Sequence, residues 1–290
     1  MFKIKTLVGK LWVFVAAVVI IGGSASIMAF ALDNNIPENA SANAAPYTAV
    51  SKESGQVQAP ETGITAEYTV VDLSKKAPDG KLRDEIKHKL SLAKDISPEQ
   101  IEEKYNAIVA NTIPGEKDIS AEQAAAYAAG IVKKVYGVDL TGYTAEASFS
   151  RNPVPNADNW GVIFHAPKED PSTRRYNASV DSVNGTMLDF GCYTLDFREE
   201  KDRDLENPEW KDKALQTISR LMPEDASIVG SKVVSAIPAG GVTVVCELSD
   251  GSAYAIRLSG ENKEAAACQY FPDGYDGSWD YHPVTTEGVG

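Results

Sequence analysis

Few side chains in this 290-residue chain are suited to catalysis, and His165 is the first candidate. It lies in a strand-like stretch, out of phase with Trp160, Val162 and Phe164, so its imidazole is expected on the other side of the sheet. The chain has no Gly-x-Ser-x-Gly, no His-Glu-x-x-His and no phosphate-binding loop. We therefore expect a structural or surface role for His165 and His88, and no catalytic residues.

The tail of the chain could offer oxygen ligands to a metal. Asp273, Asp276 and Asp280 stand among glycines, and carboxylates are ligands that Ca²⁺ accepts. Their spacing departs from the helix-loop-helix calcium loop, and no Glu stands at the closing position. Because Gly and Asp are also the ordinary residues of turns, we expect a turn-rich terminus and no metal or cofactor site.

Aromatic residues in the same tail indicate a different role. Tyr275, Trp279 and Tyr281 either pack against the sheet or form a contact patch, since aromatics are enriched at interface hot spots. They are our candidate for a partner-binding surface.

The three cysteines leave two interpretations open. Cys192, Cys246 and Cys268 are too few for a disulfide scaffold and too widely spaced for a paired-cysteine metal site. Either one pair is oxidised outside the cell, or all three are small buried apolar residues.

The N-terminus predicts export. Lys3, Lys5 and Lys10 precede Leu11–Leu32, a stretch of 22 residues without a charge, and the first acids follow at Asp33 and Glu38. A positive stem faces the cytoplasm, so residues 33–290 are expected outside the membrane.

Two interpretations of this segment stay open. A retained single-pass anchor over 11–32 has the length to cross a bilayer. A signal peptide cleaved after Ala31 fits the small-x-small form of Ala29-Phe30-Ala31 and would release the protein.

Charge argues against nucleic acid as a partner. Without the three stem lysines, 25 basic residues face 41 acids, which gives the exported part a charge of −16. Such a surface repels phosphate backbones.

A helix followed by four strands occurs twice in the predicted order of elements. Ser120 and Gln123 form a capping box before an Ala-rich helix, and Asn207-Pro208 begins the second helix. We expect an α+β fold of tandem αββββ repeats, each an antiparallel sheet with one helix packed on a face.

These features divide the chain into five parts. They are an anchor or signal segment (1–32), a flexible linker (33–63), an extended segment with a helical pair (64–116), a first repeat (117–197) and a second repeat with the acidic aromatic tail (198–290).

The first repeat resembles the PepSY domain. The resemblance rests on the capped helix from Ile119, the Trp-led strand at Trp160, and Tyr176-x-x-x-Val180-Asp181-x-x-x-Gly185. It covers 119–195, and only weakly 207–271, where Leu258-Ser259-Gly260 stands in place of Val180-Asp181-Ser182. The resemblance implies an extracytoplasmic module that regulates a peptidase, and it brings no catalytic residues.

The function expected from the sequence is therefore a non-catalytic binding or regulatory module outside the membrane. Its partner is an envelope or extracellular protein, with a protease as the class that the resemblance implies. Two alternatives remain: an unrecognised extracellular hydrolase that uses His165 or the acidic tail, and a small-ligand or Ca²⁺-binding domain.

Overall fold

The structure is a computed structural model that describes residues 67–76, 78, 80–93, 96–152, 157–196, 202–238 and 240–280. The expected anchor or signal segment (11–32), the linker (33–63) and Tyr281 lie outside these residues. Within the described part, no helix is long and apolar enough to cross a membrane.

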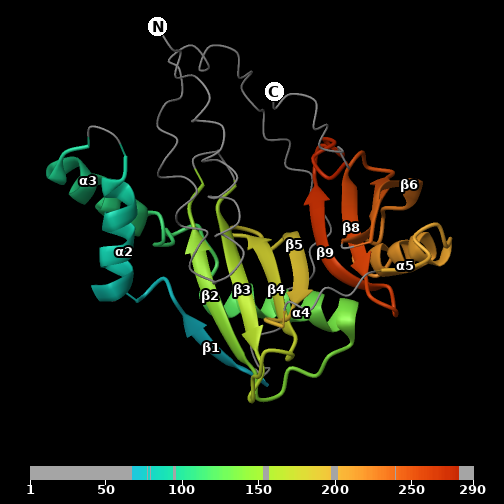
Figure 1. The fold of residues 1–290 in the computed structure, drawn as a ribbon, viewed down its shortest axis with the longest axis horizontal. Coiled ribbons are helices and arrows are strands. Elements are labelled where there is room, and N and C mark those ends of the chain that lie inside the picture. The colour runs from blue at the N-terminus through green and yellow to red at the C-terminus, as the bar shows by residue number, and fades with distance from the viewer. Residues whose placement is uncertain are drawn as a thin grey trace, which may run out of the picture.

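Nine strands form one mixed sheet, so the expectation of tandem αββββ repeats, each with its own antiparallel sheet, was wrong. The strands are β1 (Thr69–Asp72), β2 (Thr144–Ser150), β3 (Asn159–His165), β4 (Arg175–Asp181), β5 (Met187–Tyr193), β6 (Ile228–Ile237), β7 (Gly241–Leu248), β8 (Ala253–Ser259) and β9 (Glu264–Phe271). Their order is β1-β2-β3-β4-β5-β9-β8-β7-β6 (Figure 1). β1 runs parallel to β2, and the other neighbours are antiparallel.

Pairing between β5 and β9 is what joins the strands into a single sheet. Residues 189–191 of β5 lie antiparallel to residues 267–269 of β9. The backbones approach closely here, because a Cβ at Gly191 would lie 3.0 Å from the carbonyl oxygen of Ala266. Side-chain alternation specifies each strand, but it does not specify which edges of distant strands meet.

Two helices cover the same face of the sheet. α4 (Ala121–Tyr136) packs against β1–β5, and α5 (Glu209–Ile218) packs against β6–β9. One continuous core contains residues from both helices and all of these strands except β1 and β6, whose Val70 and Ile228 pack against it. The Tyr136 hydroxyl at the end of α4 donates a hydrogen bond to the carbonyl oxygen of Ala265 in β9, 2.9 Å away. α4 therefore helps to hold β9 beside β5.

The ends of α4 follow the sequence prediction. Ser120 Oγ accepts a hydrogen bond from the Gln123 N–H, and Gln123 Oε1 accepts one from the Ser120 N–H. Gly137 ends the helix at φ +65°, a conformation that suits glycine.

The helical pair α2 (Gly80–Ser91) and α3 (Pro98–Ala110) lies beyond β1, apart from the two helices that cover the sheet (Figure 1). It has its own small core of Ile86, Leu90 and Ile108. A capping box of Ser97 and Gln100 begins α3.

Candidate functional site

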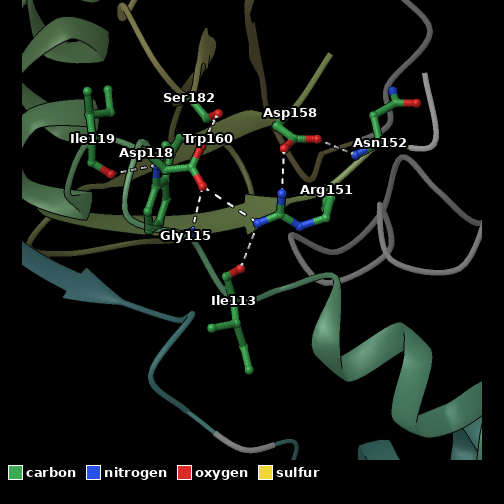
Figure 2. A network of polar contacts seen from close by, with 9 residues as sticks. All are labelled: Ile113, Gly115, Asp118, Ile119, Arg151, Asn152, Asp158, Trp160 and Ser182. Carbon is green, nitrogen blue, oxygen red and sulfur yellow. Dashed lines mark hydrogen bonds and ion pairs between the residues drawn. The ribbon is translucent and has the colours of Figure 1, made fainter. Parts of the chain in front are cut away.

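The residues that carry the family resemblance meet in a polar network at one end of the sheet (Figure 2). Trp160 Nε1–H donates to the Ile119 carbonyl oxygen over 3.0 Å, and the Ile119 N–H donates to the Ser182 carbonyl oxygen over 2.7 Å. Ser182 is fully buried, and its N–H donates to the Asp158 carbonyl oxygen. The network thus ties the start of α4 to β3 and to the β4–β5 connection.

A buried carboxylate and an arginine lie at the centre of this network. The Asp118 side chain has no exposed surface; its Oδ1 accepts from Ser182 Oγ over 2.7 Å, and its Oδ2 accepts from the Gly115 N–H over 2.6 Å. Arg151 Nη2 lies 3.6 Å from Asp118 Oδ2, while Arg151 Nη1 donates to Asp158 Oδ2 over 2.8 Å. These acids are satisfied by one cation, by backbone N–H groups and by the Ser182 hydroxyl, so removing one partner would leave a buried charge uncompensated and destabilise the fold.

The β4–β5 hairpin is wider than a tight two-residue turn at Asn184-Gly185 would be. The Gly185 N–H donates to the Asp181 carbonyl oxygen, and the Asp181 N–H donates to that of Thr186. Asp181 Oδ1 also accepts from two backbone N–H groups inside the loop, which stabilises the wider form. Gly185 has φ +73°, and a Cβ there would lie 2.4 Å from the Tyr127 ring of α4.

His165 faces away from α4, as predicted, and lies between two carboxylates. Its Nδ1 is 3.1 Å from Glu169 Oε1, and its Nε2 is 3.3 Å from Glu146 Oε2, although this buried Nε2 makes no hydrogen bond within the described part of the chain. Burial by itself would raise the pKa of the Glu169 carboxyl. Hydrogen bonds and positive charge from Arg175 and His165 outweigh burial and lower this pKa below its usual value. A histidine that activates a nucleophile must present one ring nitrogen to it, and here both nitrogens face acids. This arrangement fastens the β3–β4 connection to the sheet.

Tyr275 and Trp279, the predicted contact residues, pack on the face of the sheet opposite α5. The Tyr275 hydroxyl donates to Asp280 Oδ1 over 3.0 Å, and Trp279 Nε1–H donates to Gln269 Oε1 over 2.9 Å. Both rings keep partial exposure, so their role as a contact patch stays a prediction.

The acidic side chains of the tail make hydrogen bonds of their own. Asp276 Oδ1 accepts from the Ser278 N–H over 2.9 Å. Within the described residues, no group of three His, Cys, Asp or Glu side chains is placed to hold a metal ion. The Ca²⁺-binding alternative from the sequence stays a prediction.

A cavity of about 550 Å³ lies where β5 meets β9, and Cys192 borders it. Arg174 and Glu264 form an ion pair at its wall, and the Gly260 N–H donates to Asp202 Oδ1 over 2.5 Å. Burial raises the pKa of the Cys192 thiol. Three charged groups of this cavity, those of Arg174, Glu264 and Asp202, are thus already paired with each other or with backbone.

All three cysteines are free thiols, and Cys246 and Cys268 are buried beneath α5. Burial raises the pKa of Cys246 to about 11 and raises that of Cys268 as well. Thiols of this kind are poor nucleophiles at neutral pH.

β6 is one of the two edge strands of the sheet, and its ten residues make it longer than the four-residue β1 at the other edge. Among the strands that the structure describes, β6 pairs with β7 alone. Val229 and Val233 are 65% and 49% exposed. An edge strand of ten residues presents unpaired N–H and C=O groups along its outer side.

A groove of about 590 Å³ runs between this edge and α5. It is lined by Lys211, Leu215, Gln216 and Ser219 of α5 and by residues 228–231 of β6. Leu215 and Ile228 pack against the main core from one side and line the groove on the other. Lys211 is the one charged residue of this lining. We call the edge of β6 together with this groove the β6 edge groove.

No protein-family model, curated protein or solved structure matches the chain. The geometry of the β6 edge groove is therefore the basis for its functional interpretation.

Sequence reasoning found the tail aromatics and His165 but missed the β6 edge groove. One signal was present, because Lys232 interrupts a Val-rich strand, and lysine in such a strand is typical of a sheet edge. The pairing of Arg151 with Asp118 and Asp158 was also missed, because the order of elements alone does not bring their side chains together.

Proposed function

We propose that this chain is a non-catalytic binding module that works on the outer face of a membrane and engages another envelope protein. The observation that carries the proposal is the β6 edge groove, which combines the free edge of a strand with a lining that includes the apolar side chains of Leu215, Ile228 and Val229. Such an edge is a common site for capturing an extended segment of another protein.

The polar clusters elsewhere support the same conclusion. His165 is held by two acids, Arg151 by two acids, and Arg174 by Glu264. Each cluster lies at a connection between strands and has a clear role in holding the fold. A peptidase is the partner class that the PepSY resemblance implies, and export rests on the charged stem and the apolar stretch 11–32.

Site-specific photo-crosslinking of the full-length chain in the cell envelope tests this function. A photoreactive phenylalanine analogue is placed at Val229 in the groove, and at Leu92 as a control because Leu92 is 73% exposed and lies at the end of α2. We expect an adduct with a defined envelope protein from position 229 and none from position 92.

A second panel of exposed positions separates the general function from its location. Val183 and Ile113 are suitable because they lie near the opposite end of the sheet from the groove and are about half exposed. Adducts from these positions alone would support the binding function but would show that the binding surface is not the β6 edge groove. A chain that gives no adduct from any position, and that does not slow a panel of extracellular proteases, would refute the proposal.

A further inference from the structure

We infer that the β6 edge groove takes an extended peptide segment of the partner, added as a tenth strand, with apolar side chains on one side and an acidic side chain on the other. This inference rests on the proposed function and specifies the chemistry of its ligand. It follows from the two faces of β6 and from the charges beside them.

The face of β6 toward α5 offers apolar contacts, beside the polar residues Lys211, Gln216 and Ser219 of the helix. Val229 lines the groove beside Leu215, and Val233 lies opposite Val244, whose side chain belongs to the core beneath α5. Gly230 and Ser231 are small and leave room between β6 and the helix. Alternate side chains of an added strand point to one face, so every second residue would enter this groove.

The other face of β6 presents a cation. Lys232 lies opposite Val245 in the register, and its Nζ is 5.3 Å from the centre of the Tyr275 ring on the face away from α5. Lys232 is exposed and stands near the middle of the strand. An acidic residue of the ligand would therefore pair with it across the new strand boundary.

Glu247 limits where that acid can lie. Its carboxylate lies over Gly230: a Cβ added at Gly230 would be 2.6 Å from Glu247 Oε2. A ligand carboxylate beside Gly230 would meet a like charge, so the acid must lie at the level of Lys232. The two charges thus favour one register.

A second copy of this chain fits the edge less well than a separate peptide. Antiparallel pairing of β6 with itself about Lys232 would place the two Lys232 side chains directly opposite each other. The chain also carries a net charge of −13, which opposes association of two copies.

The test uses the full-length chain in lipid nanodiscs and the synthetic peptide Thr-Val-Thr-Val-Glu-Val-Thr-Val. Its valines share one face and its glutamate lies on the other. Binding is measured by fluorescence anisotropy, and the site by hydrogen exchange of the β6 amides. We expect saturable binding and slower exchange within residues 228–237.

Three controls separate strand addition from other binding. The same peptide with alternate N-methylated residues keeps its side chains but loses backbone donors, so its affinity should fall at least about tenfold. A Glu-to-Lys peptide should bind about two- to fivefold more weakly, the size of an exposed ion pair. Lys232→Glu should reverse that preference, whereas Lys81→Glu on α2 should not change it.

Each other outcome overturns the inference. Binding that protects amides elsewhere, that tolerates N-methylation, or that ignores Lys232→Glu means that the ligand does not add to β6. Protection of β6 in the absence of peptide, together with a dimeric mass, means that a second copy occupies the edge. No binding of any peptide removes the inference, but crosslinks in the envelope would still support the general binding function.

Discussion

The indole Nε1–H of Trp160 donates a 3.0 Å hydrogen bond to the backbone carbonyl of Ile119, the residue before the cap of α4. Trp160 is fully buried and packs edge-on against Phe149 at a centroid distance of 5.4 Å. One side chain thus fills the core between the sheet and α4 and also fixes where the helix begins.

Replacing Trp160 by Phe should destabilise the protein by about 1–3 kcal/mol, because the Ile119 carbonyl loses its donor and the core loses volume. Denaturant unfolding of the full-length chain in detergent, followed by far-ultraviolet circular dichroism, measures this. Trp279→Phe is the matched control, since Trp279 also donates through its indole but is partly exposed. Equal losses for the two variants would contradict the role given to Trp160.

Replacing Arg151 by Met should cost about 1–3 kcal/mol, because the buried Asp118 carboxylate loses its cation. The Arg151 side chain is 36% exposed, which places the cost below that of a fully buried pair. Lys81→Met removes an exposed pair in which Nζ lies 3.9 Å from Glu85, and it should cost less than about 0.5 kcal/mol. If Asp118→Asn does not reduce the cost of Arg151→Met in the double variant, the two side chains are not coupled.

Local structure was predictable from the sequence, and the assembly of the sheet was not. The capping boxes at Ser97 and Ser120 and the glycine at 137 specify helix ends through contacts within a few residues. The β5–β9 pairing brings Gly191 opposite Ala267, where a Cβ at 191 would approach the Ala266 carbonyl oxygen, and this need for a small residue is visible only when the two edges meet. The β6 edge groove could not be located without the order of the strands in the sheet, because an edge strand is one that has a neighbouring strand on one side only.

Asp189 should make the protein less stable as pH rises. Burial raises the pKa of its carboxyl, and a hydrogen bond from Ser179 only partly offsets this. The pKa of Asp189 is lower in the unfolded chain than in the folded protein, so as the pH rises the unfolded chain loses this proton first. The free energy of unfolding therefore falls as the pH rises from the unfolded-state pKa through the folded-state pKa. The free energy of unfolding of the wild type minus that of Asp189→Asn should therefore decrease between the unfolded and the folded pKa.

Asp276→Asn is the control of opposite sign. Hydrogen bonds from the Ser278 side chain and backbone lower the pKa of Asp276, so its contribution is present above the unfolded pKa and is lost as pH falls through the folded pKa. The two pH profiles should run in opposite directions. Parallel profiles would show that Asp189 is not desolvated.

Replacing Gly185 by Ala should separate α4 from the β4–β5 hairpin. The new Cβ would lie 2.4 Å from the Tyr127 ring at a positive φ, so the variant carries both a clash and backbone strain. Gly251→Ala carries the strain alone, because φ is +89° and nothing lies within 4 Å of the added Cβ. We expect a loss of about 1 kcal/mol for Gly251→Ala and a larger loss for Gly185→Ala in denaturant unfolding. In a Tyr127→Ala background the cost of Gly185→Ala should fall to that of Gly251→Ala, and an unchanged cost would mean that the ring does not pack against the hairpin.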